Sequence, residues 1–178
     1  MMPSYSRCKT NTELEKILQL QKRNLYTNIS TDEKAKEGFV TVNHDLEILE
    51  RMNSVCPHIL AWKGEVLAGY ALCMDPLFSE DIEVLKPMFK KVQKLIGKEA
   101  RFMVMGQICI DKPYRKQGIF KGLYNYMRAE LQASYTSIIT EVDDENSRSL
   151  NAHYAVGFKD LLIYPSGDRI WHLVQWEI

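Results

Sequence analysis

The sequence has no excess of charge of either sign, because 23 lysine and arginine residues balance 23 aspartate and glutamate residues. A neutral chain has no overall field that recruits nucleic acid or an anionic membrane, so we expect neither as a partner. No run of about 18 apolar residues could span a bilayer, and the segment MMPSYSRCKT lacks the apolar core of a signal peptide. We therefore expect a cytoplasmic location.

Metal-binding and disulfide patterns are missing as well. The four cysteines, Cys8, Cys56, Cys73 and Cys109, are far apart, and neither a C-x-x-C pair nor a histidine cluster completes a ligand set. We expect reduced, mostly buried thiols and no bound metal. There is also no internal repeat, low-complexity tract or linker, so the 178 residues predict one domain, 1–178, around one core.

The first part of the chain predicts two helices. Thr12 and Glu15 have the spacing of a capping box, and apolar residues at helical spacing follow them, which predicts a helix over residues 12–25. A shorter amphipathic helix follows, with Asn43 as its predicted N-cap.

A hairpin and a long connection come next. Two β-rich runs meet at Lys63-Gly64, and Gly69 marks a bulge or a close backbone approach. Residues 79–96 have a helical pattern that Pro87 interrupts, which predicts two short helices or one broken helix.

The second half of the chain alternates strands with helices. The predicted elements are a strand over 102–110, a helix over 119–133, a strand over 137–142, a helix over 147–156, and strands near 158–164 and 169–176. This order predicts an α/β (α+β) fold with a mixed six- or seven-stranded sheet flanked by helices.

The segment DKPYRKQGIFKGLY, residues 111–124, joins a predicted strand to a predicted helix. A helix start offers unpaired N–H groups and the positive end of the helix dipole, and Arg115 and Lys116 add positive charge. Neither the P-loop nor the three-glycine dinucleotide pattern is present. The segment therefore favours a diphosphate outside those two folds, and the alternative is a solvated basic loop.

Together with TEVDDENSRSLNAHYAVGF, residues 140–158, this loop resembles the acetyl-coenzyme A site of the GNAT superfamily of acyl-CoA-dependent N-acyltransferases. The loop pattern Arg/Gln-x-x-Gly-x-Gly/Ala falls on residues 115–120. The second signature falls on Glu141, Val142, Asn146, Gly157 and Phe158. The close match covers about residues 104–158. The chain departs from the pattern at Phe120, whose ring would crowd a diphosphate unless it turns toward the sheet.

The resemblance implies how acetyl-CoA is held. The backbone of a strand pairs with the pantetheine arm, the amides of residues 116–120 hold the diphosphate, and an asparagine reaches the pantetheine. In this sequence the implied cofactor-binding residues are Ile108, Cys109, Ile110, Arg115, Lys116, Gln117, Gly118, Ile119, Phe120, Asn146 and Ser149. The alternatives are an ordinary buried strand for 108–110 and a helix N-cap for Asn146.

Acetyl transfer to nitrogen requires a neutral amine, so a base has to remove a proton from the ammonium form. The resemblance implies Glu141 as this base and places the acid twelve residues later, at His153. We expect Glu141 to raise the protonated fraction of His153, and helical spacing places Tyr154 in the core instead. The alternatives are a packed His153 and an ion pair between Glu141 and Arg148.

The resemblance thus predicts an N-acetyltransferase that moves acetyl directly from acetyl-CoA to a primary amine of a small molecule or peptide. The alternative is a non-catalytic acyl-CoA-binding sensor or interaction module, and an alcohol acceptor or a longer acyl group also stays open. We expect the connection over residues 75–100 and the first two helices to wall the acceptor side. The last strand either pairs across a homodimer or is buried in the monomer.

Overall fold

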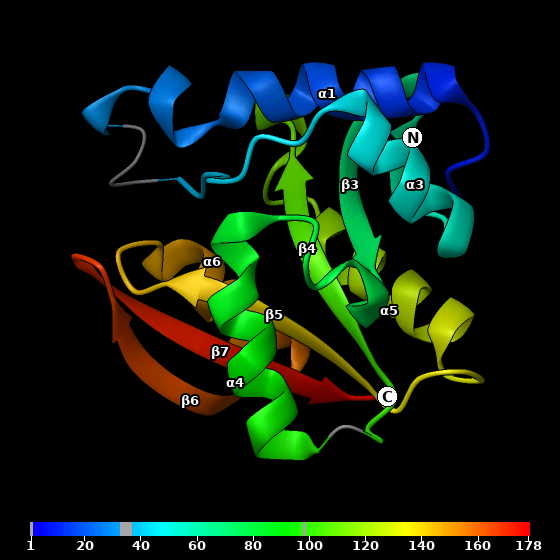
Figure 1. The fold of residues 1–178 in the computed structure, drawn as a ribbon. Helices are drawn as coiled ribbons and strands as arrows, with labels where there is room; N and C mark the ends of the chain where they lie inside the picture. The colour runs from blue at the N-terminus through cyan, green and yellow to red at the C-terminus, as the bar shows by residue number, and fades with distance from the viewer. Residues whose placement is uncertain (1, 33–36, 98) are drawn as a thin grey trace.

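The computed structural model describes residues 2–32, 37–97 and 99–178, and one seven-stranded sheet forms its centre (Figure 1). The strands are β1 (Ser4–Arg7), β2 (Ile59–Lys63), β3 (Val66–Met74), β4 (Phe102–Ile110), β5 (Ser137–Asp143), β6 (Lys159–Ser166) and β7 (Arg169–Glu177). They lie in the order β1-β2-β3-β4-β5-β7-β6, and only β4 and β5 are paired in parallel. The predicted mixed α/β sheet is confirmed. Strand β1 was not predicted, because its four residues are too few to show the alternation of apolar and polar residues that is typical of a strand.

Helices cover both faces of the sheet. They are α1 (Asn11–Asn24), α3 (Leu46–Val55), α4 (Lys86–Ile96), α5 (Ile119–Leu131) and α6 (Ser147–Val156). Helices α1, α3 and α4 lie on the face toward the viewer in Figure 1, and α5 and α6 lie behind the sheet. In the described part of the chain, none of the helices combines the length and the apolar character needed to cross a bilayer.

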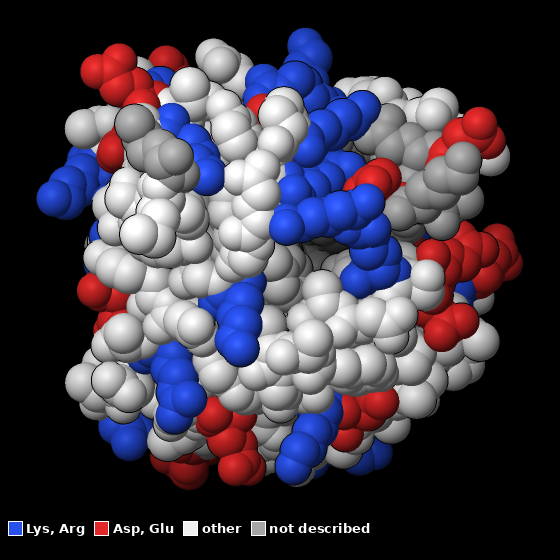
Figure 2. Space-filling model, turned by 180° about the vertical axis from the view of Figure 1, so that it is seen from behind, with Lys and Arg blue, Asp and Glu red and all other residues white. Residues whose placement is uncertain are grey.

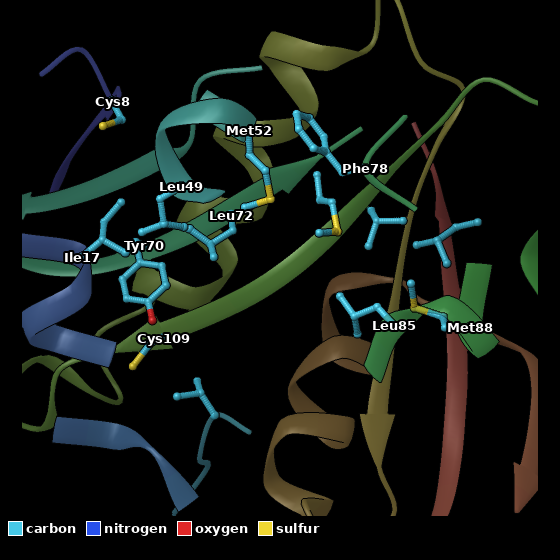
Figure 3. Close-up of a cluster of buried hydrophobic side chains, with 14 of the residues drawn as sticks. Cys8, Ile17, Leu49, Met52, Tyr70, Leu72, Phe78, Leu85, Met88 and Cys109 are labelled. Carbon is cyan, nitrogen blue, oxygen red and sulfur yellow. The ribbon is translucent and has the colours of Figure 1, made fainter. Parts of the chain in front are cut away.

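Each face carries its own cluster of buried apolar side chains. In the front cluster, shown in Figure 3, Leu49 and Met52 of α3 lie over Tyr70 and Leu72 of β3. The side chains that α4 and the residues before it contribute cover the β5 and β7 end of the same face. The sheet is therefore apolar on both sides, so polar groups between its strands have to find partners locally.

Two predicted helix N-caps are wrong by two residues. Helix α1 begins after Thr10, whose Oγ1 accepts from the Glu13 amide while Glu13 Oε2 accepts from the Thr10 amide. Thr10 and Thr12 both have a glutamate three residues later, so spacing alone could not choose between them. Helix α3 is capped by Asp45, because the Asn43 side chain accepts a hydrogen bond from Gln21.

Two further predictions need correction. Pro87 does not break a long helix, because it lies in the first turn of α4, where its missing N–H costs no hydrogen bond. The residues before it form short 3₁₀ turns, Pro76–Phe78 and Glu83–Leu85. A homodimer built through the last strand is also excluded, since β7 pairs with β5 on one edge and with β6 on the other.

The centre of the sheet opens between β4 and β5. The two strands pair only over Phe102–Val104 and Ser137–Ile139 and then separate. Beyond that point β4 carries one extra residue relative to β3, since Ala71 pairs with Ile108 but Cys73 pairs with Met105. This bulge redirects the end of β4 away from β5.

Gly69 of β3 allows the close backbone approach predicted from sequence. A Cβ at this position would lie 2.8 Å from the Cys109 carbonyl oxygen and 2.7 Å from Ile110 Cδ1, both on β4. A carbonyl held in a sheet cannot move aside cheaply, so β3 and the bulged β4 pack closely only because residue 69 has no side chain.

We predict that Gly69→Ala lowers the free energy of unfolding by about 1 to 3 kcal/mol, as expected for overpacking. Urea denaturation measures this change. Gly106→Ala is the matched control, because a Cβ there meets its nearest neighbour at 3.6 Å, an ordinary contact. Equal losses in the two variants would contradict the assigned role of Gly69.

Candidate active site

The separation of β4 and β5 opens a narrow cavity, the wedge, of about 70 Å³. Its walls are residues 105–108 of β4, residues 140–143 of β5 and the extended segment 39–42. The wedge shares lining residues with two larger cavities. The rear cavity, of about 250 Å³, lies at the start of α5 and α6, and the front cavity, of about 300 Å³, lies beside α4. One path therefore leads from the rear face through the sheet to the front face.

Segment 39–42 is held across this path by buried side-chain amides. Asn146 Nδ2 donates to the Phe39 carbonyl oxygen at 3.1 Å, and Gln107 Nε2 donates to the Val42 carbonyl oxygen at 2.7 Å. The Tyr70 hydroxyl donates to Gln107 Oε1 and fixes the orientation of that amide. These hydrogen bonds end on backbone carbonyls, so side chains hold the segment in place although it is not a strand of the sheet. Its residues line all three cavities.

The rear cavity has the features of an anion site. Gly118 is the N-cap of α5, has a φ of 78°, and has no side chain that caps the first turn. The first amides of the helix are therefore left for a ligand to pair with. Arg115, Lys116 and Arg148 line the same cavity, and Figure 2 shows Lys and Arg side chains gathered around a hollow on this rear face.

The structure brings most of the predicted cofactor-binding residues together. The members of that set that line the rear cavity are Ile108, Cys109, Ile110, Arg115, Lys116, Gly118, Ile119, Phe120 and Ser149. Gln117 does not, because its side chain is exposed and donates to the Pro113 carbonyl oxygen. Asn146 lines the wedge instead. It stands at the N-cap position of α6 without making a capping hydrogen bond, and its Oδ1 is buried with no partner in the described chain.

Arg115 contacts other parts of the protein, although we expected its charge to serve a bound anion. Its guanidinium donates to the Ile110 carbonyl oxygen at 3.1 Å, to Asn24 Oδ1 at 2.6 Å and to Glu37 Oε2 at 3.1 Å. These contacts join the end of β4 to the end of α1. The charge of Arg115 is already paired with Glu37, so amides and other basic residues have to carry anion binding.

Phe120 is accommodated in the way the sequence required. Its ring packs edge-on against Tyr124 and His153, at centroid distances of 5.2 and 5.0 Å. The ring is thus part of the rear apolar cluster. Packing between α5 and α6 therefore accommodates the phenylalanine that stands where the family pattern has a small residue.

Glu141 lies on β5 and lines both the wedge and the front cavity. Its Oε1 is buried with no hydrogen-bond partner in the described chain. Loss of hydration raises the pKa of Glu141 from 4.5 to about 7, and the charge that opposes this rise is Lys91. The predicted alternative was an ion pair between Glu141 and Arg148. Arg148 is not among the groups that shift the pKa of Glu141. Arg148 pairs with Glu37 at 3.5 Å.

His153 also lines the wedge, but the prediction that it is partly protonated near neutral pH is wrong. The side chain is buried, which lowers the pKa of His153 to about 4. Its Nδ1 lies 2.7 Å from the Ser149 carbonyl oxygen, an acceptor, so Nδ1 carries the proton. Nε2 then accepts from the Tyr124 hydroxyl at 2.7 Å. This geometry fits the alternative of a packed, neutral histidine.

Tyr154, predicted to be in the core, is instead more than a third exposed. Its hydroxyl donates to the Asp160 carboxylate at 2.9 Å. The exposed polar neighbour keeps the ring at the surface of α6.

The front cavity is mostly apolar. Its lining comprises Leu25, Tyr26, Thr27, Thr41, Val42, Leu85, Met88, Val104, Met105, Gly106, Thr140, Glu141, Arg169 and Trp171. Leu85 and Met88 come from the connection that we expected to wall the acceptor side. Most of the others could not be found from sequence, because their positions follow no fixed spacing. Within residues 2–32, 37–97 and 99–178, no cluster of three or more His, Cys, Asp or Glu residues could hold a metal ion.

Solved structures share this fold at low sequence identity. The ribosomal-protein-S18-alanine N-acetyltransferase of Escherichia coli superposes with a TM-score of 0.66 at 14% identity, covering 99% of this chain and 94% of its own. A chain of the NatC complex bound to Gag peptide and CoA gives 0.69 at 15% identity, with coverages of 100% and 99%. A GNAT superfamily phosphinothricin acetyltransferase from Sinorhizobium meliloti, in complex with AcCoA, gives 0.64 at 13%, with coverages of 100% and 89%.

The sequence has no significant match among curated proteins. The model of the acetyltransferase (GNAT) family, however, matches residues 14–158, which include the α5 start, the rear cavity and most of the wedge and the front cavity. The matched region and the shared fold agree with the resemblance seen at residues 104–158. The chain therefore belongs to the acetyltransferase (GNAT) family, whose acetyl donor is acetyl-CoA.

Proposed function

We propose that this protein transfers an acetyl group from acetyl-CoA directly to a primary amine of a small molecule or peptide, with Glu141 as the general base. One observation carries the proposal. The unpaired carboxylate oxygen of Glu141, with its pKa of about 7, lies where the wedge meets the front cavity. A base whose pKa is close to the working pH is suited to proton transfer.

The residues of the rear cavity and the wedge fit acetyl-CoA, which supplies the acetyl group as an activated thioester. The α5 amides after Gly118 would hold its diphosphate, with Lys116 nearby. The buried, unpaired Asn146 Oδ1 is an acceptor for an amide N–H such as those of the pantetheine arm. The strand residues 108–110 offer their backbone along the same cavity.

Glu141 acts on the acceptor. An alkylamine is almost entirely protonated at neutral pH, because its pKa is about 10. The ionised Glu141 carboxylate attracts this ammonium group into the front cavity and then accepts its proton, leaving a neutral amine at the wedge. His153 keeps Tyr124 and Phe120 in place rather than acting as an acid.

A covalent route through Cys109 is disfavoured. Burial raises the pKa of the Cys109 thiol to about 12, so the thiolate nucleophile is scarce. This agrees with direct transfer between two bound substrates.

The proposal also includes the type of acceptor, the single domain and the location of the protein. The similar structures include enzymes whose names specify an alanine of a ribosomal protein and the small molecule phosphinothricin, so both acceptor types stay in the proposal. One domain over residues 1–178 is supported by a sheet that runs from β1 to β7. A cytoplasmic location and a homodimer rest on the sequence alone, and the pairing of β7 on both edges gives the homodimer no support. One argument for the sensor alternative, that Phe120 crowds the diphosphate, is weakened because the Phe120 ring packs against Tyr124 and His153.

We predict that Glu141→Gln lowers kcat/KM for acetylation of an amine by about 100- to 10,000-fold, the usual contribution of a general base. Thiol release from acetyl-CoA with pooled amino acids, polyamines, aminoglycosides and short peptides identifies the acceptor, and mass spectrometry confirms acetylation of the amine. Glu130→Gln, a carboxylate on the surface of α5 that contacts Arg7, is the matched control and retains activity. Full activity of Glu141→Gln would exclude Glu141 as the base.

We predict a pH dependence that follows the raised pKa of Glu141. The base is active when ionised, so kcat/KM of the wild type rises as pH passes through about 7 and levels off below the pKa of the amine. In Glu141→Gln only the neutral amine reacts, so the rise continues to about pH 10. A pH–rate profile of both proteins tests this, and identical profiles would contradict the assignment.

We predict a matching effect on stability. A carboxyl whose pKa is 4.5 unfolded and about 7 folded stabilises the protein below pH 4.5, and this contribution is lost as pH rises to about 7. The free energy of unfolding of the wild type, relative to Glu141→Gln, falls by about 3 kcal/mol over that interval and is constant above it. Urea denaturation at several pH values measures the difference, and a pH-independent difference would show that burial does not raise the pKa.

A further inference from the structure

The front cavity is shaped for an apolar occupant. Apolar side chains reach it from five separate parts of the chain: Leu25 and Tyr26 after α1, Val42 from the crossing segment, Leu85 and Met88 at α4, Val104 and Met105 on β4, and Trp171 on β7. Its volume of about 300 Å³ is at the lower end of the range for small-ligand pockets. A side chain or small ring system fills such a space, whereas a large polar molecule does not.

Among the described residues, two charged side chains line the front cavity, and one of them is already paired. Glu141 is the acid. The guanidinium of Arg169 donates to the Asp143 carboxylate and lies over the ring of Tyr26, 5.1 Å from its centroid. The cavity therefore has one carboxylate for one ammonium group, and a second positive charge on the acceptor would approach Arg169.

Two of the hydroxyl groups of the lining already donate to acceptors within the protein. Thr140 Oγ1 donates to the Met105 carbonyl oxygen at 2.9 Å, and Thr27 Oγ1 donates to Asn28 Oδ1 at 3.2 Å. A polar group carried into this part of the cavity would lose its water without gaining a matched partner, which costs free energy.

We propose that the preferred acceptor is a primary amine attached to a large apolar group, with Leu25 and Met88 as specificity-determining residues. The amine meets Glu141 and the apolar group fills the front cavity. Two sources share this chemistry: an arylalkylamine, and a peptide whose first residue has a large apolar side chain. The inference rests on the proposed acetyl transfer, since it names the acceptor of that reaction.

The test compares acceptors in a graded series with the full-length chain. Initial rates of thiol release are measured with ethylamine, butylamine and 2-phenylethylamine, with spermidine, and with short peptides that begin with Ser or Leu. We expect kcat/KM to rise about fourfold per added methylene until the cavity is full. Spermidine falls below butylamine, and the better of the two apolar arms, amine or peptide, identifies the source.

A variant pair assigns the preference to the front cavity. Leu25→Asn places an amide in the lining and lowers kcat/KM for 2-phenylethylamine about tenfold, while ethylamine changes by less than about twofold. Leu95→Asn makes the same change on the exposed face of α4 and leaves the series unaltered. The acceptor series measured with the wild-type protein tests the apolar preference without either variant. A folding defect in Leu25→Asn therefore leaves that test intact.

Calorimetric titration of 2-phenylethylamine and ethylamine, in the presence of coenzyme A, separates this inference from the proposed function. Tighter binding of 2-phenylethylamine without thiol release supports the apolar site and overturns the acetyl transfer. Thiol release with a flat series, or with spermidine as the best acceptor, overturns the apolar preference alone. Neither binding nor thiol release overturns both.

Discussion

The end of parallel pairing between β4 and β5, after Val104 and Ile139, is the constraint on which the site depends. Continued pairing would close the sheet and leave no path between its faces. The bulge between Met105 and Ile108 turns β4 away, and Gly69 lets β3 follow that turn closely. Side chains pair with backbone carbonyls on both sides of the opening and across it. Thr140 Oγ1 donates to the Met105 carbonyl oxygen, and the side-chain amides of Gln107 and Asn146 donate to carbonyl oxygens of segment 39–42, which crosses the opening.

The same opening explains the electrostatics of the site. A carboxylate on a central strand loses much of its hydration, and Glu141 has a rise in pKa to about 7 with only Lys91 to oppose it. The rear cavity differs because its positive character comes from a helix start and from basic side chains on the surface. In the proposed reaction, an anionic cofactor and a cationic acceptor are attracted from opposite faces of the sheet, and they meet at Glu141.

Local patterns predicted the parts of the fold that local forces determine. The α6 helix was predicted with its observed bounds, and the turn at Gly118 was placed correctly, because helical spacing and a glycine at positive φ leave clear signals. Burial is set by residues distant in sequence, so the neutral state of His153 could not be foreseen. The contacts of Arg115 with Asn24 and Glu37 had no signal either, since about 80 to 90 residues separate the partners. The front cavity collects residues from six segments and became visible only in three dimensions.

Initial-rate kinetics with both substrates varied test the central claim most directly. If the wedge joins the two cavities and acetyl passes directly between bound substrates, reciprocal plots against acetyl-CoA at several amine concentrations give intersecting lines. Parallel lines would show an acetylated enzyme intermediate and contradict the account. An absence of thiol release with every amine would contradict it as well.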